Sequence, residues 1–120
     1  MPEIQLGVIE AQFADLIWAH APVTTSALVK LCAEKFGWKR TTTHTVIKRL
    51  CDKGLFRNDG GTVTACLTRE EYAAAQSHKF IDDAFRGSLP AFLAAFTGGR
   101  KLTQDEADAI RALIDRAEEP

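Results

Sequence analysis

The stretch from Trp38 to Gly54 constrains the fold of this chain more than any other segment. Four residues within it recur at i, i+3, i+4 and i+7, which is the spacing of one buried stripe on an α-helix. They are Thr43, Val46, Ile47 and Leu50. Gly54 follows Lys53 where helix C-termini favour glycine, so the pattern predicts a helix that begins at Lys39 or Arg40 and ends there.

The other positions give this helix an outward face of short hydroxyls and long cations. Such a face suits the major groove of DNA, because hydroxyls can approach base edges and phosphates while cations pair with phosphate or guanine. We therefore expect DNA to be bound by Arg40, Thr41, Thr42, His44, Thr45, Lys48 and Arg49. The alternative is a small α+β domain whose basic helix is only solvated.

A β-hairpin is predicted directly after the basic helix. Residues 55–57 and 62–67 have strand composition, and residues 58–61 form a tight turn between them. The Asp-Gly step in that turn supplies the positive φ that a short hairpin needs. Arg57 is the hairpin's only Lys or Arg, which makes it a further DNA-binding candidate with a weak grip on phosphate.

Two more helices are predicted before the basic helix, at residues 7–20 and 26–36, with a break at 21–24. Thr24 or Thr25 can cap the second one. The expected inner faces are Val8, Ile9, Gln12, Phe13, Leu16 and Ile17, then Leu28, Leu31, Cys32 and Phe36. Three helices and a hairpin in this order predict a mostly α winged helix-turn-helix with a small β-hairpin wing, assigned to residues 1–67.

The remainder, residues 68–120, predicts three helices. Capping boxes at Thr68–Glu71 and Thr103–Glu106 open the first helix, which runs to about Arg86, and the last, which runs to about Ala117. A short apolar helix lies between them at 89–97, followed by a break at Gly98-Gly99.

So small a region cannot bury its large apolar side chains alone, whereas two copies together can. We therefore expect a dimerisation domain with Phe80, Phe85, Leu89, Phe92, Leu93, Phe96, Ile110 and Leu113 between the subunits. The alternative is that these residues fold back onto the N-terminal domain as the core of a monomer.

Charge is distributed unevenly along the chain. The formal net charge is −1, but residues 1–67 sum to +2, residues 68–120 to −3 and residues 38–57 to +5. A focused patch matters more for phosphate attraction than the total, so the distribution favours a nucleic-acid partner for the basic helix. A homodimer would place two such helices about 34 Å apart on a palindromic DNA operator.

Other classes of function fit poorly. The isolated His20, His44 and His78 have no nucleophile or carboxylate at a useful local spacing, and no glycine-rich phosphate loop is present, so we expect no enzyme and no cofactor. Three scattered cysteines predict neither a disulfide framework nor a metal site, and each is expected to be a small buried side chain. The absence of a long apolar run predicts a cytoplasmic protein without membrane insertion.

The sequence resembles the penicillinase-repressor (BlaI/MecI) family of winged-helix transcriptional regulators from about Leu6 to Asp115. The residues that carry the resemblance are Leu16-Ile-Trp18, Trp38, Thr42-Thr-His-Thr-Val-Ile-Lys-Arg-Leu50, Asp52-Lys-Gly-Leu55, Phe80-Ile81, Gly87-Ser-Leu89, Phe96 and Leu102-Thr-Gln-Asp-Glu106. The resemblance implies a dimeric repressor that binds a palindromic operator through its winged helix and pairs through its C-terminal helices. It also implies a membrane sensor protease as partner, which releases the DNA by cutting the C-terminal region.

Carried over by position, the resemblance places Thr41, Thr42, His44, Thr45 and Arg49 on the operator and puts Arg40 and Lys48 on phosphates. His44 stands where relatives often have a longer cation, so the base preference is expected to differ. Ala95 replaces the asparagine that precedes the phenylalanine at the cleavage position of protease-controlled relatives, which puts proteolytic control in doubt. The cysteine-rich tail of copper-responsive relatives is absent, so no metal sensing is expected.

Overall fold

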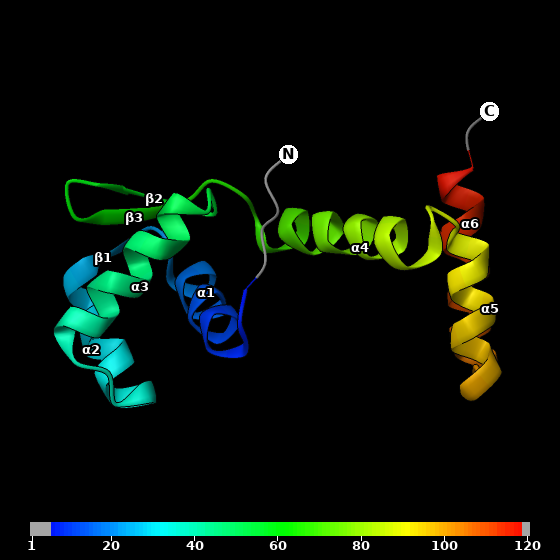
Figure 1. The fold of residues 1–120 in the computed structure, drawn as a ribbon, viewed down its shortest axis with the longest axis horizontal. Helices are drawn as coiled ribbons and strands as arrows, with labels where there is room; N and C mark the ends of the chain where they lie inside the picture. The colour runs from blue at the N-terminus through cyan, green and yellow to red at the C-terminus, as the bar shows by residue number, and fades with distance from the viewer. Residues whose placement is uncertain (1–5, 119–120) are drawn as a thin grey trace. The chain divides into compact units, whose positions relative to one another are not determined.

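The computed structural model describes residues 6–118 as a mostly helical chain with a small antiparallel sheet, which confirms the predicted fold class (Figure 1). The elements are α1 (Val8–His20), β1 (Val23–Thr24), α2 (Thr25–Phe36), α3 (Arg40–Asp52), β2 (Phe56–Asp59), β3 (Thr62–Ala65), α4 (Arg69–Phe85), α5 (Leu89–Gly99) and α6 (Gln104–Ala117). The chain forms two compact units, Met1–Ser77 and His78–Pro120, and the boundary between them in the sequence falls within α4. The functional division after residue 67 stays a prediction.

The core of the first unit lies between α1, α2, α3 and the sheet. Its largest fully buried side chains include Phe13, Leu28, Leu50, Phe56 and Val63, each of which contributes about 1.5–3 kcal/mol by leaving water. The stripe predicted on α3 is confirmed, because all four of its residues are buried. This buried stripe fixes which side of α3 faces outward.

The inner face of α1 is shorter than the sequence predicts. Val8 and Ile9 are 76% and 52% exposed, and Gln12 is exposed too. Ile9 lies in line with the buried stripe, one turn before Phe13, but stays about half exposed, while Val8 and Gln12 lie off that stripe. The residues of α1 that are buried are Phe13, Ala14, Leu16 and Ile17.

The segment predicted as a break between the first two helices contains a strand. Val23 pairs with Val63 and Thr24 with Thr62, which gives a sheet of order β1-β3-β2. This pairing gives hydrogen-bond partners to the backbone groups on the second edge of β3. The strand was not predicted because two residues are too few to show the alternation of a strand. The Thr24 hydroxyl accepts from the Ala27 amide at 3.1 Å, so Thr24 is the cap of α2.

The hairpin is confirmed, but its turn is tighter than predicted. Strand β2 extends to Asp59, so Gly60 and Gly61 alone form the turn, with φ values of +61° and +96°. The glycine pair therefore supplies the positive φ, and the Gly61 amide donates to the Asn58 side chain at 3.0 Å. Strand β3 ends at Ala65 rather than at residue 67.

The connection from α3 to the wing is a Schellman motif. The Gly54 amide donates to the Cys51 carbonyl at 3.0 Å, and the Leu55 amide donates to the Leu50 carbonyl at 3.2 Å. Gly54 has a φ of +85°, and both leucines are fully buried. This ending, which the sequence predicts from Gly54, fixes the wing to the C-terminus of α3.

The second unit contains the end of α4 with α5 and α6. Phe80, Phe85, Phe92 and Phe96 form a chain of ring contacts with centroids 5.6 to 6.0 Å apart. Both capping boxes are confirmed: Thr68 with Glu71, and Thr103 with Glu106. The break predicted at Gly98-Gly99 is wrong, because α5 continues through Gly99; neither glycine has a positive φ, and a helical glycine costs only about 0.5–1 kcal/mol relative to alanine.

The three cysteines differ in exposure. Cys32 is buried and Cys51 is partly buried, but Cys66 is exposed, which corrects the prediction for that residue. Cys66 follows the last residue of β3, and Ala65 before it is exposed as well, so the chain has already left the core at this position. All three thiols are free.

Candidate nucleic-acid interface

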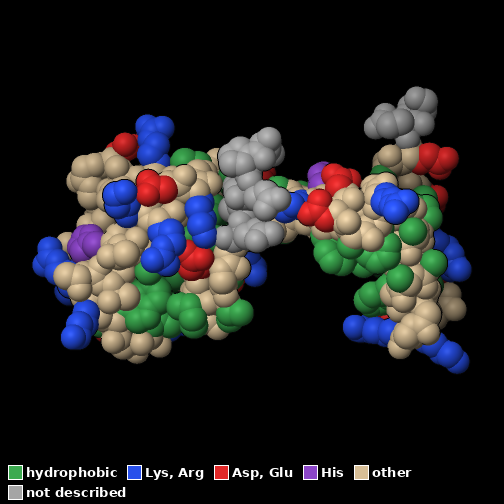
Figure 2. Space-filling model, in the orientation of Figure 1, with side chains coloured by type: hydrophobic (Ala, Val, Ile, Leu, Met, Phe, Trp, Pro, Cys, Tyr) green, Lys and Arg blue, Asp and Glu red, His purple; other side chains and the backbone are tan. Residues whose placement is uncertain are grey.

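The outward face of α3 consists of hydroxyls, one imidazole and cations. Every DNA-binding candidate of α3 is exposed: Arg40, Thr41, Thr42, His44, Thr45, Lys48 and Arg49. The buried stripe on the other side holds the helix to the core, so these side chains share one surface. Figure 2 shows Lys and Arg side chains, in blue, spread over the visible face of this unit.

The N-terminus of α3 adds backbone donors to this surface. Lys39 is the N-cap but makes no side-chain capping bond, and no acidic residue lies in the first turn of α3. The first amides of a helix have no partner within the helix, and with the helix dipole they favour an anion such as a phosphate. The Thr45 hydroxyl donates to the Thr41 carbonyl at 2.9 Å, which orients it and leaves its oxygen free to accept.

Two of the predicted cations pair with neighbouring acids. The Lys48 ammonium lies 3.2 Å from Asp52, and the Arg57 guanidinium in β2 lies 2.9 Å from Asp59. All four side chains are well exposed, so each pair contributes little, about 0–1 kcal/mol. A phosphate can therefore take the place of either carboxylate as the partner of the cation. Until it does, the carboxylates partly neutralise Lys48 and Arg57, so the surface is less positive than the number of cations suggests.

Arg49 has a partner that the sequence did not reveal. Its guanidinium lies 3.6 Å from the Glu10 carboxylate on α1, and the Lys53 ammonium lies 3.1 Å from the same carboxylate. The Gly7 amide donates to Glu10 and is the main reason why the pKa of this carboxyl lies below its usual range. Glu10 and Arg49 are far apart in sequence, so only the packing of α1 on α3 brings them together.

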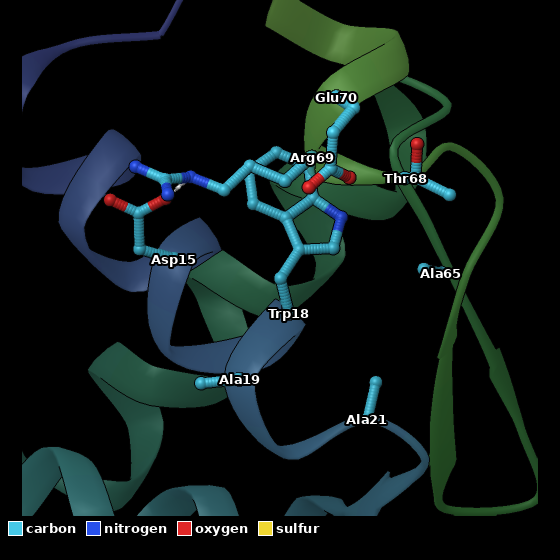
Figure 3. Close-up of a pocket in the computed structure, with 8 residues that line it drawn as sticks. All are labelled: Asp15, Trp18, Ala19, Ala21, Ala65, Thr68, Arg69 and Glu70. Carbon is cyan, nitrogen blue, oxygen red and sulfur yellow. Dashed lines mark ion pairs between the residues drawn. The ribbon is translucent and has the colours of Figure 1, made fainter.

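A hollow of the first unit lies elsewhere, between the C-terminal half of α1 and the start of α4 (Figure 3). It encloses about 520 Å³ beside the Trp18 ring. Its Asp15 and Arg69 side chains pair with each other at 3.0 Å, and the Trp18 indole N–H donates to the Leu67 carbonyl at 2.9 Å. These contacts hold the start of α4 to α1, so we interpret the hollow as a gap between two packed helices rather than as a ligand site.

Two further observations limit the chemistry of the chain. Among residues 6–118, no group of three His, Cys, Asp or Glu side chains is placed to hold a metal ion. Within the same range, no helix has both the length and the apolar character needed to cross a membrane.

Three helices, a short sheet with a hairpin wing and an exposed basic third helix define a winged helix-turn-helix protein. A comparison with known proteins makes the class specific. The family model of the penicillinase repressor matches residues 6–116. A penicillinase repressor from Bacillus licheniformis is 24% identical over 115 residues, which cover 92% of this chain and 90% of that protein.

The chain therefore belongs to the penicillinase repressor family. Membership makes it a winged-helix, DNA-binding transcriptional repressor and a regulator rather than an enzyme, as the sequence predicts. The match spans both compact units, so the resemblance is not confined to the winged helix.

Proposed function

We propose that this repressor acts as a homodimer that binds a palindromic operator, with α3 of each subunit in the major groove. The exposed face of α3 supports this most directly, since it combines hydroxyls, cations and uncapped backbone amides on one rigid element. In this arrangement Thr41, Thr42, His44 and Thr45 face the base edges. Arg40, Lys48 and Arg49, with Arg57 from the wing, complete the DNA-binding set.

Pairing through the second unit is supported by its exposed apolar surface. None of its described residues is buried, and Phe80, Leu89 and Leu113 are each more than half exposed. Figure 2 shows apolar side chains, in green, at the surface of this unit. A second copy of the chain would cover this surface. The residues that would lie between the two subunits are Phe80, Phe85, Leu89, Phe92, Leu93, Phe96, Ile110 and Leu113. A two-fold dimer also matches the symmetry of a palindromic site.

Selection of bound duplexes from a random pool by the full chain tests the proposal. The expected result is an inverted repeat whose half-sites lie about one helical turn, or roughly 34 Å, apart. Selection of a single unrepeated site would contradict the dimer. Failure to retain any duplex, including DNA from the region upstream of its own gene, would favour the alternative, a winged-helix adaptor that binds an acidic protein.

Thr45→Ala tests the placement of α3 on that operator. The variant should weaken operator binding by about 1–3 kcal/mol in a fluorescence-anisotropy titration, because a base-facing hydroxyl is lost. Thr97→Ala in α5 is a matched control, since Thr97 is also exposed and donates to the carbonyl four residues earlier, at 2.7 Å. Equal affinities for the two variants would contradict the placement.

The finer proposal is control of antibiotic-resistance or stress genes, with release by a membrane sensor protease. A cut between Ala95 and Phe96 would divide α5 and detach α6 from the rest of the pairing surface. Loss of pairing would then release DNA, because two α3 helices that bind one operator together would become two separate helices, each of which binds its half-site weakly. Immunoblotting after β-lactam treatment of the host checks this: a shortened chain supports it, and derepression with only intact chain contradicts it.

A further inference from the structure

The Glu10 carboxylate occupies an unusual place between α1 and α3. Its side chain is only 16% exposed. One oxygen, Oε1, accepts from the Gly7 amide at 3.2 Å and from the Lys53 ammonium at 3.1 Å. The other oxygen, Oε2, is buried without a hydrogen-bond partner, and the Arg49 guanidinium lies 3.6 Å from it.

This arrangement orients the Arg49 guanidinium and leaves some of its N–H donors available. A guanidinium has five N–H donors in a rigid plane, so one edge can face a carboxylate while the rest bind another anion. The Arg49 side chain is 53% exposed although its Nη1 atom lies beside Glu10. It therefore stands at the border between the buried stripe of α3 and the outward face, with donors available to DNA.

We propose that Glu10 is a positioning residue for DNA binding, which holds the Arg49 guanidinium at the edge of α3 where it meets a backbone phosphate. The inference rests on the proposed function and assigns Arg49 a phosphate rather than a base. Since a phosphate contact carries no sequence information, loss of Arg49 should weaken binding to all duplexes alike.

Two substitutions of Glu10 separate positioning from simple charge. Glu10→Gln keeps the shape and an acceptor for the Gly7 amide but removes the charge, whereas Glu10→Asp keeps the charge but is too short to reach Arg49. If Glu10 acted only as an acid near DNA, its removal would strengthen binding to a polyanion, and Glu10→Asp would behave as wild type. Positioning predicts weaker binding in both variants.

The test is an anisotropy titration of the full chain against its selected operator and a scrambled duplex over a range of salt concentrations. Both Glu10 variants should bind the two duplexes about five- to tenfold more weakly, with the slope of log affinity against log salt reduced by about 1, as for one lost phosphate contact. In an Arg49→Gln background, Glu10→Gln should have no further effect on binding.

Three outcomes would overturn the inference while wild type still binds. They are tighter or unchanged binding by Glu10→Gln, wild-type binding by Glu10→Asp, and an undiminished effect of Glu10→Gln when Arg49 is already replaced. The last would show that Glu10 acts otherwise than through Arg49, and chemical unfolding of the same variants measures separately whether the fold is lost. A wild-type chain that retains no duplex would instead overturn the proposed function itself, and this inference with it.

Discussion

At the scale of single residues, a few partly or wholly buried polar groups specify how the elements of the first unit meet. The Trp18 indole N–H and the Glu10 carboxylate each join α1 to a distant segment. Apolar burial supplies most of the stability, whereas these polar contacts are satisfied in only one arrangement.

Trp18→Phe should destabilise the first unit by about 1–2 kcal/mol. The Leu67 carbonyl loses its donor, while a ring remains to pack on Phe56 and Tyr72. Trp18→Leu removes the ring contacts as well and should cost more. Urea unfolding followed by circular dichroism measures both losses, and equal stability of Trp18→Phe and wild type would contradict the role given to this bond.

The contribution of Glu10 to stability should depend on pH. Its pKa is lowered in the folded chain, first by the Gly7 amide, so folding favours the charged form. That stabilisation is full above the pKa of an unfolded glutamate, about 4.3, and is lost as the pH falls through the lower folded value. The free energy of unfolding of wild type minus that of Glu10→Gln should therefore shrink as the pH falls below about 4.3. A constant difference in urea unfolding would contradict it.

At the scale of elements, local signals were sufficient to predict where most helices begin and end. Both capping boxes, Gly54 and the stripe on α3 act within a few residues of themselves, so their sequence determines their structure. Strand β1 and the shortened inner face of α1 depend instead on what packs against them. Val23 belongs to a strand because β3 has a free edge, and no pattern in two residues can show that.

The candidate site follows the same division. The outward face of α3 was predictable from helical spacing, because burying one side exposes the other. The partners of its cations were predictable only where they are local, as for Lys48 with Asp52 four residues later. The pairing of Arg49 with Glu10 needed the fold, because it joins two helices.

Glycine substitutions in two elements should have opposite effects on stability. Gly61→Ala should lower the free energy of unfolding by about 1–2 kcal/mol, because a φ of +96° strains a residue that has a side chain. The new methyl group itself would fit, since the atom nearest to it, the Thr25 hydroxyl oxygen, would lie 3.9 Å away. Gly98→Ala is the matched control in helix α5, where nothing lies within 4 Å, and should stabilise by up to about 1 kcal/mol. Thermal unfolding of the two variants checks the signs, and a tolerated Gly61→Ala would argue against the two-glycine turn.

At the scale of the whole molecule, the chain separates charge and apolar surface between its two compact units. Residues 38–57 of the first unit hold a charge of +5, whereas the second unit, with six Lys or Arg and eight Asp or Glu, sums to −2 and has exposed apolar side chains. An acidic region is repelled by DNA, so it suits pairing better than binding. Membership of the penicillinase repressor family assigns DNA binding, and this separation supports the division of labour proposed here.

Leu113→Glu should convert the proposed dimer to a monomer without unfolding it. Leu113 is 55% exposed in α6, so the single chain tolerates a charge there, whereas a paired surface would have to bury it. Arg111→Glu introduces the same residue on the opposite side of this helix and should stay dimeric. Light scattering coupled to size exclusion gives the masses; a Leu113→Glu variant that remains a dimer would show that α6 lies outside the interface.

Sedimentation of the full chain with its selected duplex tests the central claim most directly, because it reports how many chains the operator holds. The account predicts two chains on each palindromic duplex, and much weaker binding both to a duplex with one half-site and by Leu113→Glu. One chain on each palindrome at saturation, or equal affinity for the half-site and the full palindrome, would contradict the account of paired α3 helices on DNA.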